Sequence, residues 1–270
     1  MIIAAKKINL IAGSFWLVVI LFAISSDNAY GWGPQGHRVI GAIAEFNLAP
    51  ETKKIIVDEF NINNLADVAN WADKTRQKRK QENPWHYANV KEGEWTYSAT
   101  RDCPHAICVV EKIKEFYDIL ANIEKPLKKR KAALKYLVHF VGDVHQPLHL
   151  GNRKDRGGGK TRLTYFGRNV SLHYLWDGGL IDWKKESLLK YATRLNARLQ
   201  DSEKTEWLDS NVNDWADESR SLALKQAYPL ENNEVSKTYV SRGREILGQR
   251  MLQAGIRLAD LLNQSLKFEK

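Results

Sequence analysis

Hydrophobic residues recur with helical spacing along most of this chain. In the first such segment, Pro34 to Asn47, apolar side chains stand at positions 39, 40, 43, 44 and 46, which places them on one face of a helix. A second helix is expected from Pro50, because proline suits the first position of a helix, and a third across residues 65–72. Further helices are predicted over 109–120, 132–144, 188–199, 212–227 and 240–266.

Two segments interrupt the helical pattern. Residues 82–99 carry four aromatic side chains without a regular period, and residues 152–159 are charged and rich in glycine. After that loop, residues 161–166, a turn at Gly167-Arg168-Asn169 and a second run from Val170 predict a small β-hairpin. The chain shows no repeat, long linker or low-complexity run. We therefore expect a mainly α fold, a single helical domain with one small hairpin.

The first 31 residues have the pattern of a secretory signal peptide. Two lysines precede an apolar stretch from Leu10 to Ile24, and small residues lead up to a cleavage point after Gly31. The apolar run is shorter than the ~20 residues that span a bilayer, which favours a signal over a membrane anchor. We expect residues 1–31 to be removed and residues 32–270 to form a secreted or periplasmic domain that is not attached to a membrane.

Charge and cysteine content narrow the possible functions. The formal net charge is +9, and removal of the signal would leave 39 basic and 31 acidic side chains, or +8. This balance suggests an anionic partner such as nucleic acid, phospholipid or a phosphate ester. Export favours a local disulfide between Cys103 and Cys108 over a zinc site. Asn169 and Asn263 begin glycosylation sequons, which matter only in a eukaryotic host.

Candidate chemistry is concentrated in histidines and aspartates. His139 and Asp143 are four residues apart and so share one helical face, and His173 and Asp177 repeat that spacing. A proline two residues before His149 is expected to end the first of these helices and to turn His149 toward the same region. Two such pairs are harder to attribute to chance than one.

Four further residues extend this set. His37 follows Trp32 by five positions, and signal cleavage would give Trp32 a free α-amine that can chelate a metal together with its own carbonyl oxygen. Asp73 lies in Trp-Ala-Asp and His86 in Pro-Trp-His-Tyr. Imidazole and carboxylate groups suit zinc without any cysteine, so the whole set predicts metal binding.

Together these residues resemble the zinc-dependent single-strand nucleases, also called 3′-nucleotidases or class I nucleases of plants and fungi, which have bacterial relatives. The resemblance runs from Trp32 to the Ala-Gly-Ile-Arg-Leu-Ala run at 254–259. It implies the helical fold shared by zinc phospholipases C and single-strand nucleases. The spacing of Cys103 and Cys108 also matches a small disulfide loop of that family.

The resemblance implies three zinc ions held by three sets of ligands. Asp143 would bridge the first two sets. The first set would be Asp73, His86 and His139, the second Trp32 and His37, and the third His149, His173 and Asp177.

The implied enzyme is a monomer that hydrolyses single-stranded DNA and RNA to 5′-nucleotides and removes phosphate from 3′-nucleotides. A hydroxide held between two zinc ions would attack phosphorus, and the third ion would take up charge from an oxygen of the phosphate ester. Asp73 and Asp143 thereby gain catalytic roles. Arg76 stands where family members carry a basic residue that contacts phosphate. The alternative interpretation places Arg76 in the solvated charge run 74–80.

Base recognition is less clearly encoded. Tyr87 and Asn89 match positions near the base-binding pocket of the family, and Tyr87 could stack on a base or serve as an ordinary core tyrosine. Many members carry an asparagine that contacts the base where this chain has Gly159. We therefore expect the base preference to differ while the metal chemistry is kept.

Two other functions fit parts of the pattern. Zinc-dependent phospholipase C has a similar cluster but typically closes the third site with glutamate, where this chain has Asp177. A non-catalytic, zinc-stabilised binder of nucleic acid would use the same ligands. A bridging carboxylate argues against the binder, because bridged clusters with open positions suit hydrolysis.

Overall fold

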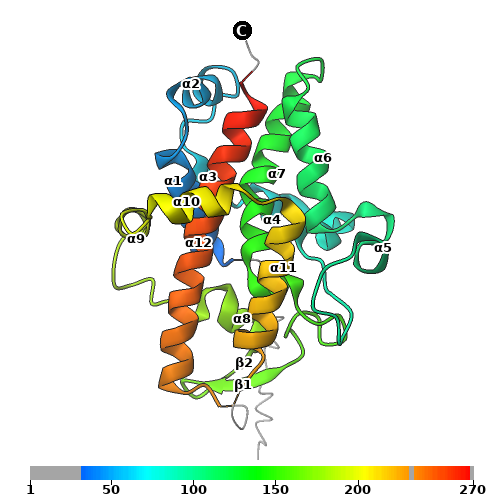
Figure 1. The fold of residues 1–270 in the computed structure, drawn as a ribbon, viewed down its shortest axis with the longest axis vertical. Coiled ribbons are helices and arrows are strands. Elements are labelled where there is room, and N and C mark those ends of the chain that lie inside the picture. Colours follow the sequence, from blue (N-terminus) through cyan, green and yellow to red (C-terminus); the bar gives the residue numbers. More distant parts are fainter. Residues whose placement is uncertain (1–31, 231–233, 268–270) are drawn as a thin grey trace, which may run out of the picture.

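The long helix α7 (Leu127–His145) lies at the centre of a bundle of helices in the computed structural model, which describes residues 32–230 and 234–267 (Figure 1). α6 (Val109–Ala121) and α12 (Lys237–Ser265) pack against it, and α1 (Pro34–Phe46) packs against α12. Every residue of α7 from Tyr136 to His145 is buried. The polar side chains in that stretch therefore need partners inside the protein.

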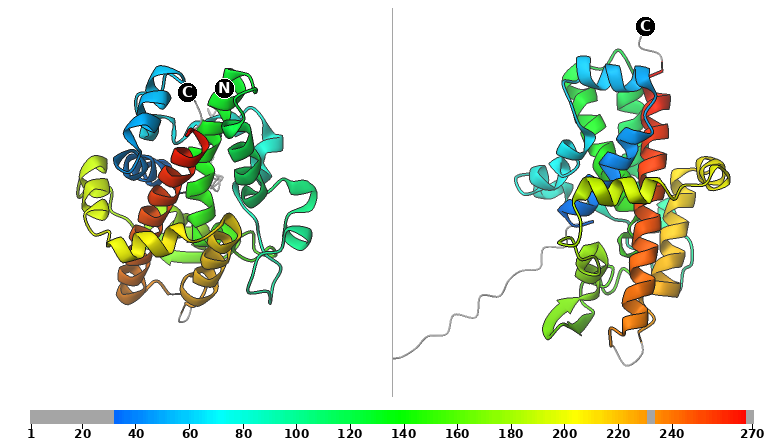
Figure 2. Two further views of the ribbon diagram at one scale, coloured as in Figure 1. Left: turned by 45° about the horizontal axis from the view of Figure 1, so that its top comes forward. Right: turned by 90° about the vertical axis from the view of Figure 1, so that its left-hand side faces the viewer.

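Shorter elements surround this centre, as Figures 1 and 2 show. The remaining α-helices are α2 (Pro50–Asp58), α3 (Leu65–Val68), α4 (Trp71–Arg76), α5 (Ala99–Asp102), α8 (Leu172–Tyr174), α9 (Leu188–Asn196), α10 (Asp201–Leu208) and α11 (Val212–Leu222). Tighter 3-10 turns occupy η1 (Lys80–His86), η2 (Pro104–Ala106) and η3 (Pro147–Leu150), and wider π-helical turns occupy η4 (Leu175–Gly179) and η5 (Ala223–Ala227).

The predicted hairpin is confirmed, with its turn in a different place. β1 (Arg162–Tyr165) pairs antiparallel with β2 (Arg168–Ser171), and Tyr165 stands opposite Arg168. The turn is therefore Phe166-Gly167, not residues 167–169. Both turn residues have positive φ, 47° and 72°, as in the type I′ turns whose twist matches that of paired strands.

The mainly α fold with one small hairpin is confirmed, and the differences are local. The third predicted helix is two short helices, α3 and α4, separated at Asn70. α10 was not predicted, because Trp207 is its one buried residue and its sequence has no apolar period. Across the described residues, no helix is both long and apolar enough to span a bilayer. The predicted signal peptide lies outside those residues.

Candidate metal centre

The structure brings together all eight histidine and aspartate side chains that the sequence singled out. They come from the first turn of α1, from α4, from the end of η1, from the second half of α7, and from η3, α8 and η4. All eight are buried. Their ligand atoms fall into three groups: Asp73 with His86 and His139, His37 with His139 and Asp143, and His149 with His173 and Asp177.

The first group has the spacing of ligands around one small cation. His139 Nε2 lies 3.1 Å from His86 Nδ1 and 3.6 Å from Asp73 Oδ1. Asp143 Oδ2 lies 2.9 Å from His86 Nδ1 and 3.2 Å from His139 Nε2. Four ligands at 2.0–2.1 Å from a tetrahedral zinc ion would stand about 3.3 Å apart. The observed separations therefore fit one small cation held by these four side chains.

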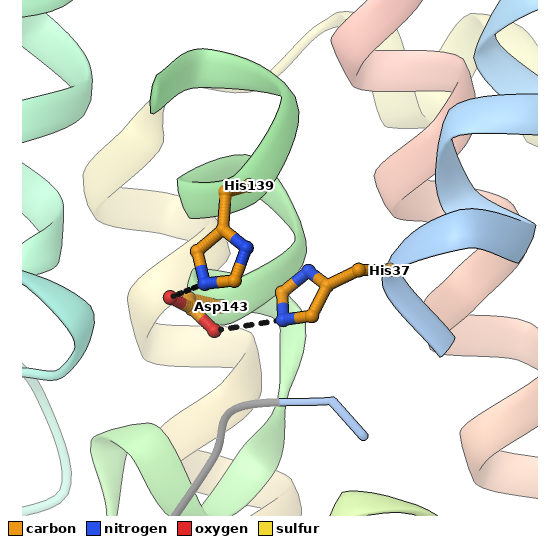
Figure 3. Close-up of side chains that lie close together, drawn as sticks. All are labelled: His37, His139 and Asp143. Atoms are coloured by element: carbon orange, nitrogen blue, oxygen red, sulfur yellow. Dashed lines mark ion pairs between the residues drawn. The ribbon is translucent and has the colours of Figure 1, made fainter. Parts of the chain in front are cut away.

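Asp143 directs its two oxygens toward different histidines (Figure 3). Oδ2 faces His139, whereas Oδ1 lies 3.4 Å from His37 Nε2. The His37 and His139 rings stack with centroids 3.8 Å apart. A single carboxylate on α7 thus faces both of the first two groups, which is the geometry that a bridging ligand requires.

The third group is built from shorter segments. His173 Nε2 lies 3.4 Å from Asp177 Oδ2, and His149 Nε2 lies 4.0 Å from Asp177 Oδ1. The two rings are stacked, with centroids 5.2 Å apart. We call these three residues the Asp177 group, and we call the first two groups together the Asp143 groups.

Backbone carbonyls fix the orientation of three imidazole rings. In each ring Nδ1 donates to a carbonyl 2.7 Å away, so that Nε2 faces the other members of its group. The pairs are His139 with Ala69, His149 with His86, and His173 with Gly157. Such contacts set the tautomer of a metal-binding histidine and raise its basicity.

Several buried polar atoms at the site have no hydrogen-bond partner. They are both ring nitrogens of His37, Nε2 of His86, both carboxylate oxygens of Asp73 and Oδ1 of Asp143. An unpaired buried polar atom costs roughly 1–3 kcal/mol, and buried polar groups are usually paired or coordinate metals. A cation in the first two groups would satisfy His37 Nε2 and the unpaired oxygens of Asp73 and Asp143, so this donor set fits a metal ion.

The electrostatics favour a cation as well. Burial alone would lower the pKa of His139, but Asp143 and Asp73 raise it to about 9. Burial opposes ionisation of Asp143, yet His139 and His149 hold its pKa well below the ordinary value. Burial raises the pKa of Asp177 well above its usual range. A nearby cation would favour the ionised form of Asp177.

Gln146 is a supporting residue that the sequence interpretation missed. Its side chain is fully buried, its Nε2 donates to Asp177 Oδ1, and its Oε1 accepts from the backbone N–H of Leu148. The first bond fixes the Asp177 carboxylate, and the second fixes the turn that carries His149. The position of Gln146 between two histidines was the available signal.

Donors from distant parts of the chain hold the last turn of α7. The Trp32 indole donates to Gly142 O at 2.6 Å, and Gly33 N donates to Asp177 O at 2.5 Å. These bonds join the two residues before α1 to the end of α7 and to η4. Two further carbonyls at the end of α7 are also bonded: Val144 O accepts from Ser219 Oγ, and His145 O accepts from Arg250 Nε.

His145 faces away from the metal groups, as expected for a packing residue. Its Nδ1 donates to Val141 O at 2.7 Å, and its Nε2 lies 2.9 Å from Arg257 Nη1. Glu218 binds both Arg257 and Arg250, with shortest contacts of 2.6 Å. This buried network supports the side of α7 opposite the candidate centre.

The other predicted site residues lie around the groups. Arg76 is buried, with Nε 3.1 Å from Asp73 Oδ1, so it is not part of a solvated charge run. Tyr87 is 38 % exposed, which excludes a fully buried core role. Gly159 is the last residue of the 152–159 loop. Asn89 lies beside that loop, because its Oδ1 would be 3.1 Å from a Cβ atom added to Gly157. The Cys103–Cys108 disulfide is present.

Comparison with known proteins identifies the family. The S1/P1 nuclease family matches residues 32–267. Endonuclease 2 of Arabidopsis thaliana is 26 % identical over 92 % of this chain and 95 % of its own length. Nuclease S1 of Aspergillus oryzae is 28 % identical over 87 % of this chain and 91 % of its own length. Nuclease P1 of Penicillium citrinum is 24 % identical over 86 % of this chain and 97 % of its own length. The chain therefore belongs to the S1/P1 nuclease family.

Proposed function

We propose that this chain is a zinc-dependent, single-strand-specific nuclease and 3′-nucleotidase with three metal ions. The observation that carries the proposal is the position of Asp143, whose two oxygens face two adjacent histidine groups. Membership of a nuclease family supports nucleic acid as the substrate in preference to a phospholipid. The net positive charge also suits a polyanionic substrate.

The ligand assignment follows the three groups. Asp143 would serve both of the first two ions. Asp73, His86 and His139 would hold the first ion, His37 with the α-amine and carbonyl of Trp32 the second, and His149, His173 and Asp177 the third. The indole contact with Gly142 supports the role of Trp32, because it holds the start of α1 beside Asp143.

Other side chains near the metal groups would contact the phosphate and the base of the substrate. When bound, the ions would polarise the phosphate ester and lower the pKa of a coordinated water. Arg76 holds a positive charge beside Asp73, where it contacts a phosphate oxygen of the substrate. Tyr87 follows His86 directly and exposes its ring, so it stacks on the base, with Asn89 and Gly159 shaping the same pocket. Gly159 has no side-chain amide to contact the base, which changes the base preference.

Maturation completes the site in this proposal. Removal of residues 1–31 frees the α-amine of Trp32, and the monomeric product acts outside the cytoplasm. A chain that keeps Gly31 has an amide nitrogen at that point, which is a poor metal ligand.

The proposal is tested on two proteins, one that begins at Trp32 and one that begins at Gly31. Metal analysis should give about three zinc ions for the first and fewer for the second. The first should cut single-stranded DNA and RNA to products with 5′-phosphates and release phosphate from 3′-nucleotides. Equal activity of both proteins would contradict the Trp32 assignment. Hydrolysis of phosphatidylcholine without cleavage of nucleic acid would contradict the nuclease itself.

A further inference from the structure

The connection between α6 and α7 carries apolar and basic side chains together on the surface. Eight consecutive residues, 122–129, are exposed. Ile123 is 63 % exposed and Leu127 is 49 % exposed. Residues 122–131, here called the α6–α7 tip, contain five basic side chains and a single acidic one, Glu124. Figure 1 shows this tip at one end of the bundle and the β1–β2 hairpin at the other.

Most of the positive charge of the tip is available to a partner. Arg130 is the exception, because it is buried, its Nε donates to Leu120 O at 2.8 Å, and its guanidinium lies 5.4 Å from the centre of the Phe60 ring. The other four cations form no ion pair with any carboxylate of the residues that the structure describes: Lys125, Lys128, Lys129 and Lys131. The tip therefore presents positive charge that the protein itself does not neutralise.

Neither packing nor turn geometry accounts for the two aliphatic side chains. Asn122 closes the turn by itself: its carbonyl accepts from Lys125 N at 3.0 Å, and its side-chain oxygen accepts from Glu124 N at 2.9 Å. The side chain of Ile123 takes no part in these bonds, and polar residues or proline are usual in such turns. Scattered surface leucines need no explanation. Ile123 and Leu127 differ because they stand four residues apart within one basic tip.

The tip lies far from the candidate metal centre. α7 begins with Leu127 at the tip and reaches His139 and Asp143 in its second half. A helix rises 1.5 Å per residue, so these ligands lie about 18–24 Å from the tip along the helix axis. A surface bound at the tip would therefore leave the metal groups open to soluble substrates. Such a surface would be a place of attachment and not a substrate.

We propose that the α6–α7 tip binds the surface of an anionic lipid bilayer, with Ile123 and Leu127 inserted among the headgroups and the four outward lysines against the lipid phosphates. Aliphatic side chains beside lysines are typical of protein segments that lie in a membrane interface. Nucleic acid is the other candidate polyanion, but proteins bind single strands with aromatic rings that stack on bases, and the tip contains no aromatic residue. The contact is peripheral and reversible, and it does not depend on the proposed reaction.

The test measures sedimentation of the mature chain, residues 32–270, with vesicles of phosphatidylglycerol and phosphatidylcholine in equal parts. We expect binding at low salt that is largely lost at about 0.5 M salt, because salt screens the charges, and little binding to phosphatidylcholine alone. Ile123→Ser combined with Leu127→Ser should weaken binding about tenfold or more. Lys128→Gln combined with Lys129→Gln should weaken it about 25-fold, at roughly fivefold for each lysine. All four positions are exposed, so folding should be kept.

Leu189→Ser is the matched control for the aliphatic pair. Leu189 is 60 % exposed on α9 and is followed by Lys190, so it offers the same chemistry at another place. This variant should bind vesicles like the natural chain. Equal weakening by Leu189→Ser would indicate adsorption without a defined site and would overturn the proposal. Failure of the natural chain to bind anionic vesicles would overturn it as well.

A second measurement separates the bilayer from nucleic acid and from the nuclease assignment. Fluorescence anisotropy with a cleavage-resistant phosphorothioate single strand of about 12 nucleotides reports binding of the other polyanion. The tip variants should bind this strand like the natural chain. Loss of strand binding with unchanged vesicle binding would assign the tip to nucleic acid and overturn the proposal. Vesicle binding requires no catalysis, so its result holds even if the chain cuts no substrate tested.

Discussion

The Asp143 groups and the Asp177 group use the same residue types on different supports. Asp143 and His139 lie on one turn of the buried second half of α7, and their ligand atoms lie 3.2 Å apart. The Asp177 group is carried by a 3-10 turn, a three-residue helix and a π-helical turn, and its longest contact is 4.0 Å. The long helix fixes the spacing of His139 and Asp143 by itself, whereas the Asp177 group depends on neighbours such as Gln146 and Gly157.

The largest effect is expected for Asp143, the carboxylate shared by two groups, in comparison with Asp177, which serves one group. Asp143→Ala should lower activity by about 10³-fold or more and reduce bound zinc by two ions, because one residue serves two groups. Asp177→Ala should reduce bound zinc by one ion. Metal analysis of the two purified variants beside the natural chain checks this. Full zinc content in Asp143→Ala would show that Asp143 is not a bridge.

A smaller effect is expected at Gln146, because it acts on the Asp177 group alone. Gln146→Leu removes the bond to Asp177 and should weaken the third zinc ion about 10- to 100-fold, the usual cost of losing a partner that orients a ligand. Zinc titration should show one weakened site beside two unchanged ones. Gln264→Leu, at an exposed position of α12, is the matched control. Weakening of all three sites would mean that Gln146 supports the fold as a whole.

The smallest effect concerns the face of α7 that binds no metal. Burial alone would raise the pKa of Glu218, but Arg257 and Arg250 lower it to about 2. A lowered folded-state pKa means that this ionised carboxylate stabilises the fold above pH 4.5 and that the stabilisation is lost as pH falls toward 2. Because the Glu218 side chain is 35 % exposed, solvent screens part of this interaction, and Glu218→Gln should cost about 1 kcal/mol at pH 7.

Urea unfolding of Glu218→Gln and the natural chain at pH 7 and pH 3 measures that difference. The difference in unfolding free energy should narrow at pH 3, because the unfolded natural chain is then protonated at Glu218 and must release that proton to fold. Glu245→Gln, at an exposed position of α12, is the control and should stay within about 0.5 kcal/mol of the natural chain. An equal difference in unfolding free energy at both pH values would show that the ion pair is not the cause of that difference.

The sequence predicted the parts of the site that follow from local spacing. His139 and Asp143 had to share a helical face because they are four residues apart, and the hairpin followed from its glycine turn. The convergence of His37, Asp73 and His86 on that face depends on tertiary packing, so only the family resemblance grouped them. Whether Trp32 ligates a metal stays a prediction.

Other features of the fold were not predicted, because hydrophobic periodicity does not reveal them. α10 has one buried residue, and its indicator was the capping box of Gln200 and Glu203, which hydrophobic periodicity does not register. The turn was predicted one residue late because Phe166 is a residue that positive φ disfavours. Nothing in the local sequence marks Arg250 and Arg257 as buried, yet both are buried and paired with Glu218.

The donors at the end of α7 also have a consequence for the order of folding. Gly142, Val144 and His145 receive their bonds from residues 110, 75 and 105 positions away. Contacts at such separations form late, because loop-closure entropy must be overcome first. During synthesis, α7 emerges from the ribosome long before Arg250 exists. The nascent chain therefore carries most of the proposed metal ligands before it can hold them in place, and the centre is completed only when both ends of the chain have docked.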